Sequence, residues 1–399
     1  MHLTRDSVRS TALFAALALV LSACTETGDG GDPAQQHDLQ RTPTPSGQEL
    51  EPVDTSGVQV PTQFDQLVTV EPAWDLPVQS GEDILLSAEE TDRALVFRAV
   101  GPTGTVLWSA ERPRSCSGFV VTEDADGREL AVLTDTEAGD DQVAVVTASA
   151  YDLASGAPVW GPVEVPGPHA GPGLVFEAPP EGFMGESGEP VALDPGTGRR
   201  IAAEDGRVLG EFRGTLVRVG TDAITGSRSS GEPAWTIPLD DLGHGIGASK
   251  LAVSPKADPT PGLALLDGGG GMGPLIDLES GEVLAPAVRD AARDSSSATT
   301  ALLDENGLTV LDAAGDEQLS MSVSSEATLE AVVGVLVYLR DGTSVRVHNG
   351  VTGGVAQAYA QDGDGAVALP VHVTPHGSGT LQVGDRTLLA TSRVTDDHR

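Results

Sequence analysis

The sequence predicts an all-β protein folded as a β-propeller of four-stranded blades, and two observations lead to this fold class. A short phrase of the form Asp/Asn-x-x-Ser/Thr-Gly recurs between runs of alternating or β-branched apolar residues. Six steps separate Gly104 from Gly353, so the mean period is (353 − 104)/6, or about 41.5 residues, which is typical of one propeller blade per repeat. Seven hairpins and one blade shared by the two chain ends give eight blades, with seven as the alternative.

Each copy of the phrase is expected to form a tight hairpin turn with a structural role. Asp or Asn caps its own backbone, Ser or Thr hydrogen-bonds locally, and Gly takes a positive φ at the end of the turn. Five copies begin and end at Asp152 and Gly156, Asp194 and Gly198, Asp222 and Gly226, Asp277 and Gly281, and Asn349 and Gly353. Degenerate copies that end at Gly104 and Gly315 bring the number of hairpins to seven.

Tryptophans follow several of these turns and are expected to pack between neighbouring sheets. Trp108 and Trp160 each come four residues after a turn glycine, and Trp235 follows Gly226 after a lengthened hairpin. A large flat ring at this position supplies core where sheets stack side by side. Trp74 lies in a stretch, 71–78, that repeats 232–239 almost residue for residue, although no hairpin precedes it. We therefore expect an N-terminal strand around Trp74 to complete the C-terminal blade and so close the ring.

Residues 1–24 have the features of an export signal. Arg5 and Arg9 precede an apolar stretch, 11–21, that is too short to span a membrane. The stretch ends in Leu21, Ser22, Ala23 and Cys24, which resembles a bacterial lipobox, the motif whose cysteine is acylated with diacylglycerol and becomes the mature N-terminus. Two acyl chains would hold the protein firmly. We expect lipidation at Cys24 and a location on the extracytoplasmic face of the cell membrane.

Three further segments follow the signal. Residues 25–62 are rich in Gly, Pro, Thr and acidic residues and are expected to be a disordered tether. Residues 63–395 form the propeller, and 396–399 are a short tail. The net charge of −36 disfavours nucleic acid and anionic lipid headgroups as ligands, so the membrane is contacted through the lipid anchor. We expect a monomer that binds one or more protein partners.

No metal or cofactor site is predicted. Turns such as 124–127, 304–307 and 362–365 resemble the start of a calcium loop but lack its full ligand set. His372 and His376 have the spacing of a zinc half-site, yet no third ligand accompanies them. Cys116 is expected to be buried or inert once Cys24 is lipidated.

The recurring Asp-x-x-Ser/Thr-Gly-x-x-x-Trp phrase resembles the repeat of the pyrroloquinoline-quinone-like, or quinoprotein-type, β-propellers. The copies at 152–160, 194–198, 222–235 and 277–284 carry the resemblance. It is similar in kind to the lipid-anchored, non-enzymatic scaffold propeller of the bacterial outer-membrane protein assembly machinery. The family also contains quinone-dependent dehydrogenases, whose vicinal cysteines or calcium–quinone pocket this sequence does not supply, so calcium and pyrroloquinoline quinone are not expected.

Two functional classes remain open. The first, which we favour, is a tethered, non-catalytic binding or scaffold module that uses the funnel face or an exposed edge strand. The second is a quinoprotein-like or other enzyme, or a cofactor binder, that uses the central channel. A cluster of carboxylates and arginines at the ring axis would favour the second class, and an apolar face with a polar rim would favour the first.

Overall fold

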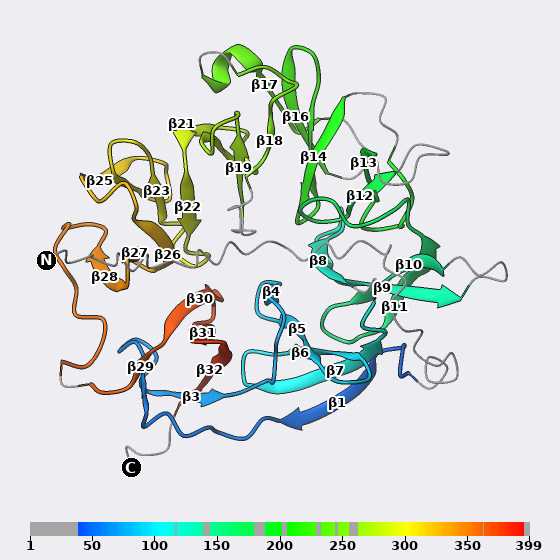
Figure 1. Ribbon diagram of the computed structural model, residues 1–399, viewed down its shortest axis with the longest axis horizontal. Coiled ribbons are helices and arrows are strands. Elements are labelled where there is room, and N and C mark those ends of the chain that lie inside the picture. Colours follow the sequence, from blue (N-terminus) through cyan, green and yellow to red (C-terminus); the bar gives the residue numbers. More distant parts are fainter. Residues whose placement is uncertain are drawn as a thin grey trace, which may run out of the picture.

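The chain folds into sheets arranged in a ring, as in a β-propeller, which confirms the predicted fold class (Figure 1). The computed structural model describes residues 39–115, 118–138, 144–178, 188–201, 206–228, 233–243, 246–254, 262–361 and 363–394. β4, β8, β26 and β30 lie near the centre of the ring, and β1, β17 and β25 lie at its periphery (Figure 1).

Within the described residues, seven sheets have three or more strands, and we number them blades 1 to 7. Blade 1 contains β4 (Gln79–Ser80), β5 (Leu85–Glu90), β6 (Leu95–Val100) and β7 (Thr105–Arg112), with β1 (Thr44–Glu49) as a fifth strand on β7. Blade 2 contains β8 (Phe119–Glu123), β9 (Glu129–Ala138), β10 (Ala144–Asp152) and β11 (Pro158–Glu164). Blade 3 contains β14 (Arg207–Phe212), β15 (Thr215–Val219), β16 (Ala223–Arg228) and β17 (Trp235–Pro238), followed by the 3₁₀-helix η1 (Leu239–Leu242).

The remaining blades follow the same antiparallel order. Blade 4 contains β18 (Ala252–Val253), β19 (Leu263–Asp267), β20 (Gly273–Asp277) and β21 (Val283–Val288). Blade 5 contains β22 (Asp290–Arg293), β23 (Thr300–Leu303), β24 (Leu308–Leu311) and β25 (Glu317–Met321). Blade 6 has three strands, β26 (Thr328–Val333), β27 (Leu336–Asp341) and β28 (Ser344–Asn349). Blade 7 contains β30 (Leu369–Val373), β31 (Gly379–Val383), β32 (Arg386–Val394) and β3 (Leu67–Val70).

Two short pairs complete the strands. β12 (Val175–Ala178) and β13 (Glu189–Ala192) form an antiparallel pair that follows blade 2 and precedes blade 3 in the chain. β2 (Val58–Gln59) and β29 (Ala366–Val367) form a parallel pair. The count of seven blades therefore matches the alternative given by the sequence rather than the expected eight.

The hydrophobic core lies between the blades. β7 shows how the sequence produces this arrangement, because its residues alternate between buried and half-buried positions, with Val106, Trp108 and Ala110 on the buried side. Trp108 packs in one cluster with Phe97 of blade 1 and with residues of blade 2. Neighbouring blades thus bury each other's apolar faces.

The segment that follows residue 38 is held against the ring, which differs from the free tether expected for 25–62. β1 pairs with β7, Pro52 bridges Val70, and β2 pairs with β29. The strand that joins the C-terminal blade is β3, which pairs with β32 and ends before Trp74. Trp74 itself lies outside the strands, in the connection from β3 to β4, and is buried there.

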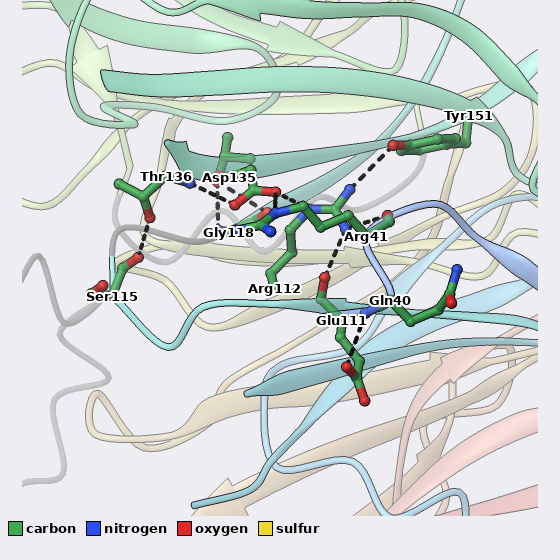
Figure 2. A network of polar contacts seen from close by, with 10 residues as sticks. Gln40, Arg41, Glu111, Arg112, Ser115, Gly118, Asp135, Thr136 and Tyr151 are labelled. Atoms are coloured by element: carbon green, nitrogen blue, oxygen red, sulfur yellow. Dashed lines mark hydrogen bonds and ion pairs between the residues drawn. The ribbon is translucent and has the colours of Figure 1, made fainter. Parts of the chain in front are cut away.

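A polar network fixes the first described residues to blades 1 and 2 (Figure 2). Arg41 Nε donates to Asp135 Oδ2 at 2.7 Å, and Glu111 N donates to the Gln40 carbonyl at 2.7 Å. Arg112, which is only 2% exposed, donates to the Arg41 carbonyl at 2.5 Å and to Tyr151 Oη at 3.2 Å. Its Nε lies 3.5 Å from Asp135 Oδ2, so the buried guanidinium has a carboxylate beside it. Residues 40–41 therefore help to neutralise and order charges that the two blades bury.

Candidate functional site

A cavity of about 720 Å³ lies at the ring axis, and all seven blades contribute to its wall. The lining residues come from turns and inner strands, with Glu82 from blade 1, Glu129 from blade 2 and Arg213 from blade 3. Blades 4 to 7 contribute Glu279, residues 290–295, residues 329–332 and residues 371–375. Such an axial cavity follows from the fold, because the inner strands of a ring converge without meeting.

The wall of this cavity is strongly acidic. Its lining contains seven carboxylates, those of Glu82, Glu123, Glu129, Glu279, Asp290, Asp294 and Glu330. Against them stand two arginines, Arg213 and Arg293, and one histidine, His372. Carboxylates and arginines therefore converge at the axis, which is the feature expected of the second functional class, an enzyme or cofactor binder.

Both arginines are already engaged within the fold. Arg213 Nη2 lies 2.8 Å from Glu129 Oε1, and Arg293 Nη1 lies 2.9 Å from Asp277 Oδ2. Burial pushes the pKa of Asp277 upward, but hydrogen bonds from Ser280 and Arg293 outweigh it and hold that pKa below its ordinary value. Glu330 accepts two hydrogen bonds from Arg340, at 2.7 and 3.0 Å. The pairs of Arg213 and Arg293 connect blade 2 with blade 3 and blade 4 with blade 5, whereas the Arg340–Glu330 pair lies within blade 6.

One corner of the cavity is tightly built around Glu129. The backbone N–H of Glu82 donates to Glu129 Oε1, the same oxygen that Arg213 contacts. A Cβ atom on Gly81 would lie 2.6 Å from both oxygens of Glu129, so a larger residue here would displace that carboxylate. Arg213 has a φ of 46°, an uncommon value for a residue with a side chain, and it precedes Gly214 in the hairpin turn between β14 and β15. The turn thus places the guanidinium over the carboxylate of blade 2.

Two carboxylates of the lining remain available to a ligand. The side chains of Glu82 and Glu279 are exposed and make no ion pair within the described part of the chain. Carboxylates that face a polar cavity attract ammonium and guanidinium groups. The arrangement is therefore suited to binding a cation rather than an anion.

The tryptophans predicted from the repeat form joints between successive units instead of lining the cavity. Each indole N–H donates to the carbonyl of the residue that follows the aspartate of the next turn. The pairs are Trp108 with Leu153 at 2.7 Å, Trp160 with Pro195 at 2.6 Å and Trp235 with Leu278 at 2.8 Å. The turn glycines Gly156, Gly198 and Gly281 lie against the same rings, where a Cβ atom would be 2.6 to 3.0 Å from ring or Cβ carbons of the tryptophan. The Nε1 atom of Trp74 has no hydrogen-bond partner among the described residues.

The turns themselves have the expected local chemistry at four positions. Asp152 Oδ1 accepts from Ser155 N and Oγ at 2.8 and 2.6 Å, and Asp277 Oδ1 accepts from Ser280 N and Oγ at 3.0 Å. Asp194 Oδ1 accepts from Thr197 Oγ1 at 2.7 Å. Asn349 Oδ1 accepts from Thr352 N at 2.9 Å. Each glycine that ends these turns has a φ near 70°.

The copy from Asp222 to Gly226 is not such a turn, so this expectation is wrong. β16 begins at Ala223 and continues through Gly226, which pairs with Trp235 and does not have a positive φ. A Cβ atom there would lie 2.1 Å from the Trp235 ring, so this glycine makes room for the indole. A further turn was missed at Asp294, whose Oδ2 accepts from Ser297 N at 2.7 Å. Ala298 occupies the glycine position with a φ of 56°, and only the Asp-x-x-Ser part of the phrase could have revealed it.

Other candidates from the sequence are turns or partners of neighbouring groups. Asp124 Oδ1 accepts from the backbone of Asp126 and Arg128, and its Oδ2 accepts from the Arg128 guanidinium. His372 lines the cavity, and His376 Nδ1 lies 2.5 Å from Asp83 Oδ2. No three His, Cys, Asp or Glu side chains are placed to hold a metal ion in the ranges that the structure describes. Leu21, Ser22, Ala23, Cys24 and Cys116 lie outside the described residues. Among the described residues, no helix has the length and apolar character needed to cross a bilayer.

Comparison with known proteins adds little to this geometry. No protein-family model and no curated protein matches the chain. Among solved structures, the crystal structure of the eukaryotic initiation factor is similar over 82% of this chain and 94% of that chain, at 8% identity and a TM-score of 0.34. A likeness this distant carries no argument about function.

Proposed function

We propose that the protein is a lipid-anchored, extracytoplasmic and non-catalytic β-propeller that binds a protein partner through a cationic segment at the ring axis. The observation that supports this proposal is the charge of the axial cavity, where seven carboxylates face two arginines and one histidine. Because both arginines are paired with carboxylates of other blades, they offer little to an anion. The lipobox ending at Cys24 supports the location, since an exported, acylated chain would present this cavity outside the cell.

The roles of the charged side chains support binding rather than chemistry. Arg213 and Glu129 connect two blades, Arg293 and Asp277 connect two others, and Arg340 supports Glu330 within blade 6. A catalytic group must approach a reacting atom directly, whereas these side chains are held by one another. Glu82 and Glu279 are the groups left to contact a lysine or arginine of the partner.

Site-specific photo-cross-linking in the native cells tests this proposal. A photoreactive residue at position 82 or 279 reports contacts inside the cavity, and one at Glu164, exposed on β11, serves as the control. We expect the cavity positions to capture the same protein, through a segment rich in lysine or arginine, and the control to capture none. Capture should weaken in Cys24→Ala cells. A captured protein seen only from position 164 would contradict the axial site.

A second candidate is an enzyme or cofactor binder that uses the same channel, and the convergence of carboxylates with arginine at the axis favours it. Native mass spectrometry of the chain purified from its own cells distinguishes the two. A bound small molecule that is lost on Arg213→Gln substitution would support this second candidate. The absence of a bound small molecule from both forms, together with protein capture from position 82, would support the binding module.

We also propose that the protein belongs to the quinoprotein-type propellers and that the β12–β13 pair is part of an eighth, reduced blade. His169 bridges Phe176 on one side of the pair, and Leu193 bridges Arg200 on the other, as inner and outer strands would. Trp160 also donates its indole N–H to the Pro195 carbonyl of this unit, just as Trp108 and Trp235 donate to the turn of the next blade. Amide exchange tests this idea, because Ala170 N donates to Val175 O and Ile201 N donates to Ala192 O. Both amides should exchange as slowly as those of complete blades.

A further inference from the structure

Among the residues that the structure describes, blade 6 has three strands, which leaves part of β28 without a paired strand on its outer side (Figure 1, where β28 lies at the left). After β28 the chain turns at 349–354 and begins to return, since His348 bridges Val355 and Ala356 N donates to Val347 O at 2.8 Å. It then leaves the edge, and the Ala358 carbonyl accepts from Thr62 N instead. The returning segment packs in one cluster with Val345, but it makes no backbone hydrogen bond to Ser344–Arg346 among the described residues.

The backbone N–H and C=O groups of alternate residues of β28 point away from β27 and can bind another strand. Val347 O and Asn349 N form their hydrogen bonds with the returning segment, away from β27. Backbone groups two residues apart in a strand point the same way, so the N–H and C=O of Val345 also point outward. No hydrogen bond to these groups is found within the described residues. An unpaired donor and acceptor on an edge strand form a template for another strand.

The Asn349 end of β28, beside the 349–354 turn, is apolar, whereas Asp341 lies opposite Ser344 at the other end of the strand. Val335, Val351 and Val355 are 42%, 56% and 76% exposed, and they are three of the five exposed large hydrophobic residues in the described part of the chain. The 335 and 351 positions are neighbours, because Gly350 N donates to Val335 O at 2.7 Å. Residues 348–361 contain no Asp, Glu, Lys or Arg, in a chain whose net charge is −36. The segment 348–361 therefore adds no carboxylate that would repel an acidic partner segment.

The charged residue of β28, Arg346, favours a partner segment with a carboxylate. Arg346 is exposed and makes no ion pair with any described residue. In an antiparallel pair, a carboxylate on the added strand directly opposite an arginine is favourable, and a like charge is unfavourable. Two copies of this chain would bring together two bodies of charge −36, so a second copy is a poor occupant.

We propose that the open half of β28 receives an extended segment of a partner protein as a fourth strand of blade 6. The segment carries β-branched residues that cover the exposed valines and a carboxylate opposite Arg346. The Val345 N–H and C=O supply main-chain hydrogen bonds, and the valines and Arg346 supply selectivity. This surface is separate from the axial cavity, so the proposal does not depend on the proposed function.

Fluorescence anisotropy with a synthetic peptide tests the proposal on the full-length chain in detergent. The probe is a labelled nine-residue peptide of alternating valine and threonine with one central glutamate, and a peptide with proline at its centre is the control. We expect saturable binding of the probe alone, and slower exchange of the Val345 amide in the complex. Val345→Pro removes the outward N–H without touching the bonds to β27, and it should weaken binding at least tenfold. Val345→Thr keeps the N–H and should leave binding unchanged.

A charge exchange keeps the test decisive if the proline variant unfolds. Arg346→Glu should weaken binding of the glutamate peptide several-fold, and a peptide with lysine in place of glutamate should recover it. No saturable binding up to millimolar peptide, or equal binding by the Arg346→Glu variant with both peptides, would overturn the proposal. A concentration-dependent dimer that Val345→Pro abolishes would overturn it in favour of a second copy.

Discussion

Replacing Glu211 by glutamine removes a carboxyl group that joins three successive units of the ring. Glu211 is 1% exposed at the end of β14, and its Oε1 accepts from Thr122 Oγ1 at 2.6 Å and from Gly214 N at 2.5 Å. Its Oε2 accepts from Leu174 N, just before β12, at 2.9 Å. All three partners donate, and an amide offers only one acceptor oxygen. With the amide oxygen toward Thr122 and Gly214, the Leu174 N–H faces the new NH₂ group and loses its partner. With the oxygen toward Leu174, Gly214 N keeps only its 3.1 Å contact with Thr122 Oγ1.

The difference in the free energy of unfolding between wild type and Glu211→Gln should depend on pH. A buried backbone N–H left without an acceptor costs about 1–3 kcal/mol. Burial is the largest influence on Glu211 and raises its pKa above the ordinary 4.5, against the hydrogen bonds from Thr122 and Gly214. A raised folded pKa means that the group contributes its full stability below pH 4.5 and loses it as the pH rises through the folded pKa. Glutamine does not titrate, so the gap between wild type and Glu211→Gln should narrow toward high pH.

Urea unfolding followed by tryptophan fluorescence, at pH 5 and pH 8, measures both parts of this prediction. Comparing the variant with wild type at each pH cancels the titration of every other group. Glu164→Gln, an exposed change on β11, should shift the free energy of unfolding by less than about 0.5 kcal/mol at either pH. A gap that widens from pH 5 to pH 8 would show that the charged carboxylate is the stable form and would refute the reasoning.

Three other substitutions test the joints of the ring by the free energy of unfolding. Trp108→Phe removes the hydrogen bond to the Leu153 carbonyl of the next blade and should lower the free energy of unfolding by about 1–3 kcal/mol more than Trp74→Phe does, because the Trp74 indole N–H has no partner among the described residues. Equal losses in the two variants would argue against a stabilising role of this hydrogen bond. Gly281→Ala places a Cβ atom 2.6 Å from a tryptophan and should cost clearly more than Gly377→Ala, which meets nothing within 4 Å at a similar φ. Asp135→Ala leaves a buried guanidinium without its carboxylate and should cost about 3 kcal/mol, and thermal unfolding within 1 °C of wild type would contradict this.

The local rules in the sequence predicted the turns and the repeat because each depends on a few adjacent residues. Asp152 and Asp277 cap their own turns whatever surrounds them. The same letters failed at Gly226, where pairing of β16 with β17 and the demand of Trp235 for space override the local turn preference. The carbonyl that each indole contacts belongs to the next unit, so no local pattern identifies it.

Residues 39–62 show a second limit of composition. Pro, Gly, Ser and Thr indicate that a segment has no core of its own, and this holds for β1, whose residues are all exposed. A sheet edge that lacks a partner can nevertheless order such a segment through main-chain hydrogen bonds alone. Pro45 and the bulge between Pro45 and Gln48 then make β1 a poor template for any further strand. Composition therefore predicted the exposure of this segment and missed its order.

The axial cavity could not be predicted from the sequence, because residues far apart in the chain, such as Glu82 and Glu330, come to line the same cavity only when the whole ring has formed. Its construction also determines which residues can report on binding. Arg213 and Glu129 form an ion pair between blades 3 and 2, so substituting either residue changes the free energy of unfolding as well as the charge of the cavity. Glu82 and Glu279 contribute charge without an ion pair in the described structure. A loss of partner binding on reversing these two charges, at unchanged unfolding free energy, would therefore be attributable to the cavity itself.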